Sequence, residues 1–352
     1  TVTQLAQATG LSRPTVESVL TGLCERNIAT DLGYRLSDGP TVGRPARRYG
    51  FENNSHFFVG AYLGPTTLHA WVASFSGEIL HTLIDSYPHD CLGHDRLAHL
   101  ALNIHTLLHQ AGADPARVLA AGVSLPGMID AHGTVVTTHV IPDLTGVQVR
   151  SILEDHLNFP ITVDNDVRLA SLAEHRIGAA HNHDDALYLH IADRQSAGLI
   201  LGGKIRKGHH GAAGEIGGLL APHRVNHQGH LLWPGGLTTH EVFSRALNGN
   251  RAAKESIASY AADISTPLAS LVMGVDPDVV VIGGLEPRAI ELLISRLQPA
   301  LQAAIPLPIT PVIVPSQLGH DGVVLGALVA ALSRSDELTG IPEPGIVLPQ
   351  HG

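Results

Sequence analysis

The sequence predicts an α/β protein made of a small basic head and a larger body with two lobes. Short apolar runs alternate with helical stretches from residue 57 onward, a pattern typical of helices layered on mixed sheets. Positive charge is concentrated in the first 50 residues. The remaining chain of about 300 residues exceeds what one hydrophobic core usually holds, so we expect two lobes with a cleft between them.

Composition excludes several classes of protein. Of the 352 residues, 44% are hydrophobic and only 15% are charged, so the chain can bury a core and is not intrinsically disordered. No apolar run reaches the roughly 18–20 residues of a membrane span, which predicts a soluble cytoplasmic protein. Two cysteines, Cys24 and Cys91, exclude a disulfide framework and a four-cysteine zinc site.

The charge is unevenly distributed. Residues 1–50 carry six arginines against four acidic residues, whereas the rest of the chain carries 16 basic and 28 acidic residues. The net charge of −10 alone would argue against nucleic-acid binding. A basic head on an acidic body instead suits a DNA-binding protein whose larger part has another task.

Residues 1–25 predict two short helices joined by a turn at Gly10. Ser12 is a suitable N-cap for the second helix, and Leu11 is expected to fill the space between the helices. Helical spacing predicts two apolar faces, formed by Val2, Leu5 and Ala6 and by Val16, Val19, Leu20 and Leu23. The opposite face predicts DNA contacts through Arg13, Pro14, Thr15 and Ser18. The alternative is an ordinary helical hairpin with a solvated face.

A β-like segment from Ala29 to Leu36, a turn at 37–40 and a basic Gly-Arg-Pro element at 43–49 predict a wing after the helices. Its expected DNA contacts are Arg44, Pro45, Arg47 and Arg48. The winged helix-turn-helix domain should span residues 1–54. Such domains commonly have one more helix before the pair, and the chain starts at Thr1, so we expect residues upstream of it.

The body should span residues 55–352. Expected strands are Phe57–Leu63, Leu68–Ser74, Val118–Leu125, Ala186–Ile191, Ala197–Leu201 and Val279–Ile282. Expected helices are Leu97–Gln110, Val167–Ile177, Ala252–Val272 and Pro287–Ala304.

Several segments of the body resemble one family in the order in which they occur. They are Gly122–Asp130, Val163–Val167 with Ala170, Ala173 and Glu174, Lys207–Gly217, Val280–Gly284, and Leu318–Ala330. These segments resemble the ROK family (repressors, open reading frames and sugar kinases), and the N-terminal segment is similar to that of the family's regulators. The resemblance implies a two-lobed actin-like ATPase (ribonuclease H-like) fold behind a winged helix-turn-helix.

The motifs that kinases of this family use to hold nucleotide are altered. Phosphorylation needs a carboxylate base, for which Asp166 is suitable, and backbone N–H groups around the phosphates. The family's Asp-x-Gly-Gly-Thr loop reads Tyr-Leu-Gly-Pro-Thr at 62–66, and its Gly-Thr-Gly-x-Gly loop reads Ala-Asp-Arg-Gln-Ser at 192–196. Pro65 removes a donor, and Asp193 would repel phosphate. We therefore expect no kinase activity and no cofactor.

The cysteine-rich zinc loop of the family is also absent. Residues 221–230 contain His223, His227 and His230, which are possible imidazole ligands, but a solvated loop is the favoured interpretation. We expect no metal.

A carbohydrate site is partly retained. The resemblance implies ligand contacts at Pro126, Gly127, Asn165, Asp166 and Glu215, whose planar polar groups suit vicinal hydroxyls. Gly218 stands where the family has a histidine. The alternative is a vestigial cleft whose carboxylates only cap helices or pair locally.

These observations predict a DNA-binding transcriptional regulator, a repressor without enzymatic activity. Its partners would be a double-stranded DNA operator and a small carbohydrate or sugar phosphate effector. A homodimer or homotetramer would suit a palindromic operator. One alternative is a sugar kinase with an appended DNA-binding domain, and another is a regulator whose body only dimerises.

Overall fold

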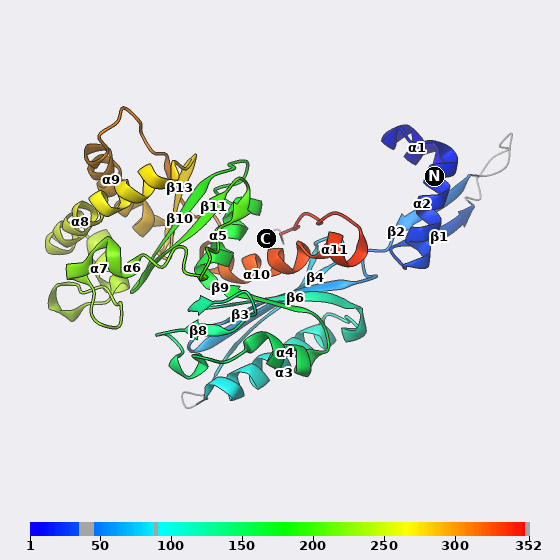
Figure 1. The fold of residues 1–352 in the computed structure, drawn as a ribbon, viewed down its shortest axis with the longest axis horizontal. Coiled ribbons are helices and arrows are strands. Elements are labelled where there is room, and N and C mark those ends of the chain that lie inside the picture. Colours follow the sequence, from blue (N-terminus) through cyan, green and yellow to red (C-terminus); the bar gives the residue numbers. More distant parts are fainter. Residues whose placement is uncertain (35–45, 88–90, 349–352) are drawn as a thin grey trace.

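The computed structural model describes residues 1–34, 46–87 and 91–348 (Figure 1). A small head at one end contains α1 (Val2–Thr9) and α2 (Arg13–Glu25). The antiparallel pair β1 (Ala29–Tyr34) and β2 (Arg47–Phe51) follows. Gly10, with φ of 71°, ends α1, and the Ser12 hydroxyl caps α2, as predicted.

The apolar interior of the head is smaller than predicted. Val2, Val16 and Leu20 are buried together. The expected positions of three other side chains are wrong, since Leu5, Leu11 and Val19 are 37%, 47% and 51% exposed. The reason is that α1 and the strand pair cover only a narrow stripe of α2, which leaves its flanks in solvent.

The first lobe is built on a five-stranded sheet in the order β5-β4-β3-β6-β9. Its strands are β3 (Phe57–Leu63), β4 (Thr67–Ser74), β5 (Ile79–Ser86), β6 (Val118–Leu125) and β9 (Ile161–Asn165). Figure 1 shows α3 (Gly93–Gln110) and α4 (Val149–Leu157) on one face and α10 (Gly322–Leu332) on the other. The short strands β7 (Met128–Ile129) and β8 (Val135–Thr137) follow β6.

The second lobe has a sheet in the order β12-β11-β10-β13-β14. Its strands are β10 (Ala186–Ile191), β11 (Gln195–Leu201), β12 (Lys204–Ile205), β13 (Val279–Gly283) and β14 (Ile313–Pro315). Its helices are α6 (Gly217–Leu220), α7 (Thr239–Leu247), α8 (Arg251–Val275) and α9 (Pro287–Ala304), and α5 (Asp166–Ile177) packs on the opposite face. The chain ends with α11 (Ser335–Thr339) and an extended segment.

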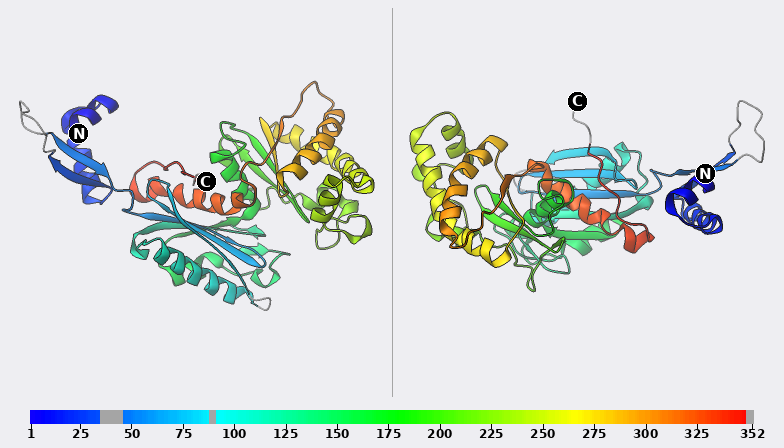
Figure 2. Two further views of the ribbon diagram at one scale, coloured as in Figure 1. Left: turned by 180° about the vertical axis from the view of Figure 1, so that it is seen from behind. Right: turned by 90° about the horizontal axis from the view of Figure 1, so that it is seen from above.

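Helices α5 and α10 pack against each other where the two lobes meet (Figures 1 and 2). Their contact depends on Gly326, because a Cβ atom there would lie 1.9 Å from the Leu169 carbonyl oxygen. Gly122 in β6 is equally constrained, with its Cβ position 1.9 Å from the Ala327 carbonyl oxygen. The sequence therefore uses glycines to let backbone meet backbone at the centre of the molecule.

Most predicted elements of the body are confirmed. Strands β3, β6 and β10 have the predicted bounds, and the four predicted helices differ from the observed ones by at most four residues at either end. Strands β5 and β9 and helices α4 and α7 were not predicted as elements. In the part of the chain that the structure describes, no helix has the length and apolar character needed to cross a bilayer.

The glycine contact predicts a large effect of a small substitution. Gly326→Ala should lower the free energy of unfolding by about 3 kcal/mol, because the added methyl group overlaps a carbonyl that cannot move freely. Gly274→Ala in α8 is a matched control, since nothing lies within 4 Å of its Cβ position. Urea unfolding of both variants checks this, and equal midpoints would contradict it.

Candidate functional site

The expected DNA-contacting residues of α2 lie on one exposed face. Arg13, Pro14, Thr15 and Ser18 are all exposed, and Arg13 is the first residue of the helix. A hollow of about 680 Å³ lies between the start of α1, α2 and the strand pair, and both Arg13 and Arg47 line it. Positive charge at a helix N-terminus adds to the field of the unpaired N–H groups there.

The arginines of the strand pair do not all lie together. Arg47 forms an ion pair with Asp31, and the Gly33 N–H and Arg47 lower the pKa of that carboxyl. Arg48 is exposed and, as the next residue of β2, points to the other face of the pair. Arg44 and Pro45 lie outside the described residues.

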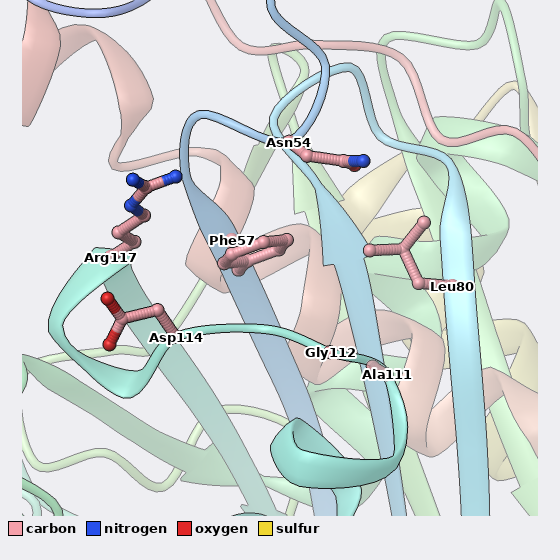
Figure 3. Close-up of a pocket in the computed structure, with 7 residues that line it drawn as sticks. All are labelled: Asn54, Phe57, Leu80, Ala111, Gly112, Asp114 and Arg117. Carbon is pink, nitrogen blue, oxygen red and sulfur yellow. The ribbon is translucent and has the colours of Figure 1, made fainter.

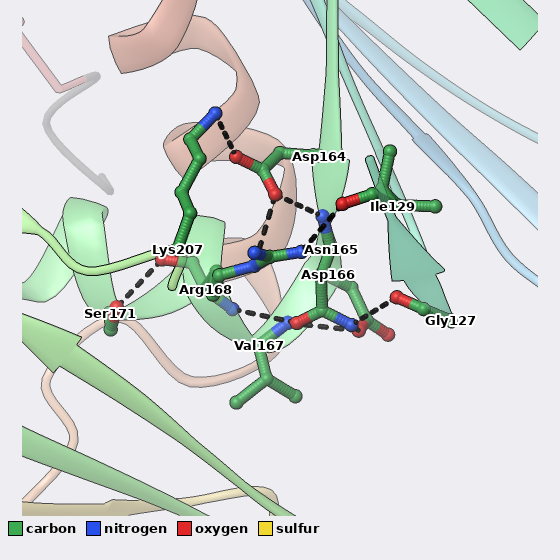
Figure 4. A network of polar contacts seen from close by, with 9 residues as sticks. All are labelled: Gly127, Ile129, Asp164, Asn165, Asp166, Val167, Arg168, Ser171 and Lys207. Carbon is green, nitrogen blue, oxygen red and sulfur yellow. Dashed lines mark hydrogen bonds and ion pairs between the residues drawn. The ribbon is translucent and has the colours of Figure 1, made fainter. Parts of the chain in front are cut away.

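Four of the five expected ligand-binding residues meet where β6 and β9 end. These neighbouring parallel strands bring Leu125 opposite Asn165, so Pro126 and Gly127 lie beside the start of α5. The Asn165 Nδ2 group donates to the Gly127 carbonyl at 3.0 Å and to Asp166 Oδ1 at 3.1 Å (Figure 4). Gly127 has φ of 136°, and a Cβ there would lie 2.8 Å from the Thr137 carbonyl oxygen.

Asn165 and Asp166 also cap the start of α5, as the alternative of a vestigial site predicts. Asn165 is the N-cap of α5, with its Oδ1 accepting from the Arg168 N–H at 2.9 Å. Asp166 Oδ1 accepts from the Val167 N–H at 2.9 Å. A carboxylate has about four acceptor positions, so Asp166 retains capacity for a ligand.

A buried ion cluster behind these residues was missed by sequence reasoning. Asp164 lies 3.0 Å from Arg168 Nε and 2.6 Å from Lys207 Nζ, and it joins β9 and α5 to the loop that begins at Lys207 (Figure 4). Asp164 and Arg168 are both 2% exposed. The spacing of four residues between them was the available signal. Among the described residues, Arg168 Nη1 is buried without an acceptor.

Glu215 is the fifth expected residue, and its charge acts on Asp166. Burial raises the pKa of Asp166 to about 6, and the charge of Glu215 adds to this, while Arg168 opposes it. Desolvation likewise raises the pKa of Glu215 against the attraction of Arg168 and His139. Two carboxylates and a guanidinium thus act on one another electrostatically, and the oxygens of the two carboxylates suit hydrogen bonding to a polyhydroxylated ligand.

The first altered nucleotide loop is closed by its own atoms. The Gly64 N–H donates to the Thr67 carbonyl at 2.9 Å, which completes a tight turn between β3 and β4. The ring of Tyr62 lies 2.8 Å from the Cβ position of Gly64. Burial and the charge of Asp166 raise the pKa of the Tyr62 hydroxyl. The turn therefore does not fit a phosphate, because its donor and its space are already used.

The second altered loop, between β10 and β11, is held by its side chains. Asp193 Oδ1 accepts from the Thr239 N–H at 2.9 Å, which places a carboxylate at the N-terminus of α7. Gln195 Oε1 accepts from the Tyr260 hydroxyl at 2.6 Å. Arg194 Nη2 crosses to the first lobe and donates to the His139 carbonyl at 3.2 Å. These contacts leave this loop unsuited to a nucleotide.

The histidine segment does not fit the zinc site of the family. His223 Nε2 lies 3.2 Å from Asp263, and Arg224 pairs with the same carboxylate. The described residues contain no group of three or more His, Cys, Asp or Glu side chains that could hold a metal ion. An ion pair to α8 thus holds the start of this segment.

A second hollow, of about 190 Å³, lies in the first lobe where β3 and β6 begin. The residues that line it include Asn54, Phe57, Asp114 and Arg117 (Figure 3). It is smaller than the roughly 300–1,000 Å³ of typical ligand pockets. Neither this hollow nor the one on the head includes an expected ligand-binding residue of the body.

Two α/β lobes that meet at a pair of central helices, with polar residues at the ends of β6 and β9, define a two-lobed α/β protein. The chain belongs to the ROK family, whose model matches residues 59–230 and 223–334.

Individual relatives include both regulators and kinases. A xylose repressor from Bacillus subtilis (strain 168) is 25% identical over 216 residues, or 61% of this chain and 54% of the repressor. The chain spans about half the length of the curated relatives it matches. A ROK hexokinase from Thermus thermophilus is 27% identical, with a TM-score of 0.65, over 80% of this chain and 99% of the hexokinase.

A ROK transcriptional regulator, a homologue of the E. coli MLC protein, shares the fold over 96% of this chain and 93% of its own. Its TM-score is 0.73 at 20% identity. The fold shared with this regulator covers more of the chain than the 80% shared with the hexokinase, and it includes the head.

The raised pKa of Asp166 predicts that replacing its carboxylate by a neutral group stabilises the folded protein at neutral pH but not at acidic pH. Wild-type protein should lose stability as the pH rises from about 4 to about 6, because the folded state holds the proton more tightly than the unfolded state does. Asp166→Asn should therefore raise the free energy of unfolding at pH 7 by about 3 kcal/mol at most and change it little at pH 4. Urea unfolding at both pH values checks this, with exposed Glu255→Gln as control. An equal effect at both would contradict it.

Proposed function

We propose that this chain is a DNA-binding transcriptional repressor whose body binds a carbohydrate-type ligand. The observation that carries the proposal is the exposure of Arg13, Pro14, Thr15 and Ser18 at the N-terminal end of α2. Beside them, Arg13 and Arg47 line one hollow together with Glu17. Helices α1 and α2 with the pair β1–β2 form a winged helix-turn-helix over residues 1–54, and residues 55–352 form the sensing and oligomerisation part. The resemblance to a xylose repressor supports this assignment.

In this proposal the N-terminal end of α2 enters the major groove. Arg13, Pro14, Thr15 and Ser18 would face base edges, since short side chains and one arginine fit close to them. Arg44, Pro45, Arg47 and Arg48 would contact phosphates and the minor groove. A symmetric dimer or tetramer would match a palindromic operator, and such a regulator would act in the cytoplasm.

The ligand would bind at Pro126, Gly127, Asn165, Asp166 and Glu215. Vicinal hydroxyls, or the hydroxyls of a sugar phosphate, would donate to the two carboxylates. No cofactor or metal is proposed. The closed turn at Gly64 and the side chains that fill the loop at 192–196 support a body without kinase activity.

Selection of duplexes from a random pool by the full chain tests the head. We expect Arg13→Ala and Arg47→Ala each to weaken binding of the selected duplex by about tenfold at fixed salt, since one such contact is worth about 1–3 kcal/mol. Arg251→Ala is the matched control, because Arg251 is exposed and pairs within its own helix. Failure of the wild-type chain to enrich any duplex would overturn the proposal.

A panel of sugars and sugar phosphates tests the body. A ligand at a hundredfold excess over Kd should stabilise the protein by about 2.7 kcal/mol, and Glu215→Gln should reduce this shift. The similarity to a hexokinase makes a sugar kinase with an appended DNA-binding domain the second candidate. Sugar-dependent production of ADP well above background would favour that kinase, whereas a ligand shift without turnover supports the sensor.

A further inference from the structure

The head is held by the body through a buried residue between α2 and β1. Ile28 is 1% exposed and belongs to one apolar cluster with Phe58 and Phe75 of the first lobe and Leu328 and Leu332 of α10. Leu23 of α2 packs against the same cluster. A side chain so enclosed fixes the end of α2 against α10, because moving it would open a cavity.

Arg26 adds a polar contact at the same junction. It is the C-cap residue of α2, and its guanidinium donates to the Thr339 carbonyl at the end of α11 and, at 3.1 Å, to the Gly22 carbonyl. After α11, Ile341 and Ile346 pack against the cluster that contains Ile28. The C-terminal segment therefore covers the junction between head and body.

The pair β1–β2 is held to the first lobe as well. The ring of Phe51 stacks on that of Phe75 with centroids 5.8 Å apart, and the Phe75 N–H donates to the carbonyl of Asn53, two residues after β2, at 3.0 Å. Both elements of the head thus meet the first lobe directly, in addition to the chain connection between them.

The same helices reach the ligand-binding residues. Helix α5 begins at Asp166 directly after Asn165, and its Leu169 carbonyl lies against Gly326 of α10. At the other end of α5, Arg176 pairs with Glu343 of the C-terminal segment at 3.3 Å. Helix α5 therefore contacts both structures that hold the head, namely α10 and the C-terminal segment.

We propose that Ile28 and Arg26 are positioning residues that couple the ligand cleft to the DNA-binding head through α10 and the C-terminal segment. The inference rests on the proposed function. A ligand acts by binding one arrangement of α5 and α10 better than another, and tight packing at Gly326 passes the change to α10. Ile28 and Arg26 then set the orientation of α2.

Coupling between two sites is reciprocal, so DNA itself is a sufficient probe and no sugar needs to be known. Hydrogen exchange is measured in residues 166–177 and 322–332 of the full chain, with and without a saturating amount of the selected duplex. We expect the duplex to change exchange there at least threefold in wild-type protein. In Ile28→Ala the change should be absent, and in Arg26→Gln it should be reduced by half or more.

The controls separate positioning from folding. Ile28→Val and Arg26→Lys retain the packing and the donor and should behave as wild type, as should the distant Arg251→Gln. Exchange in residues 279–283 of the second lobe reports whether Ile28→Ala remains folded, and Arg26→Gln provides a test that leaves the core intact.

The possible failures are distinguishable. If the duplex binds but leaves α5 and α10 unchanged, or changes them equally in wild type and Ile28→Ala, the coupling is overturned while the regulator remains. If wild-type protein binds no duplex, the proposed function fails first, and the coupling falls with it.

Discussion

The contact between α5 and α10 is the constraint on which the other parts of the structure depend. At Gly326 the two helices approach until a carbonyl of one occupies the place of a side chain on the other. Because packed interiors do not deform continuously, this contact fixes how the two lobes meet. It also places Asn165 and Asp166 at one end of the pair and the junction with the head at the other. The residues expected to bind a ligand and the junction with the head therefore lie on one continuous pair of helices.

The polar chemistry around Asp164 and Asp166 follows from burial as much as from residue type. Asp164 pairs with both Arg168 and Lys207, so Asp164 and Arg168 can lie 2% exposed behind the expected ligand-binding residues. Within residues 1–34, 46–87 and 91–348, Asp166 and Glu215 form no ion pair, and desolvation raises their pKa values. The side chains of the loop between β10 and β11 form hydrogen bonds within the protein. Asp193 accepts from the N-terminus of α7, and Gln195 accepts from the Tyr260 hydroxyl. Arg194 donates to a carbonyl of the first lobe.

Local patterns predicted the elements of the body well, because runs such as Val118–Leu125 are buried on both faces and bounded by turn residues. Local patterns failed for Leu11 and Val19, because their exposure depends on which other elements of the head pack against α2. The meeting of Pro126, Gly127, Asn165 and Asp166 was accessible through family resemblance. The role of Lys207 opposite Asp164 was not, since it depends on a loop from the other lobe. Likewise, nothing local in Ile28 indicates that it belongs to the interior of the body.

The tyrosine at position 62 limits what a single substitution can change in the turn after β3. Its ring occupies the turn after β3, and its hydroxyl lies within the field of Asp166. Restoring an aspartate there would place a second negative charge near Asp166, next to a turn whose N–H group is already bonded. That variant would be less stable, and the Gly64 N–H of its turn would still be bonded to the Thr67 carbonyl. A single substitution at position 62 therefore does not open the turn, because the bond between Gly64 and Thr67 must also be broken.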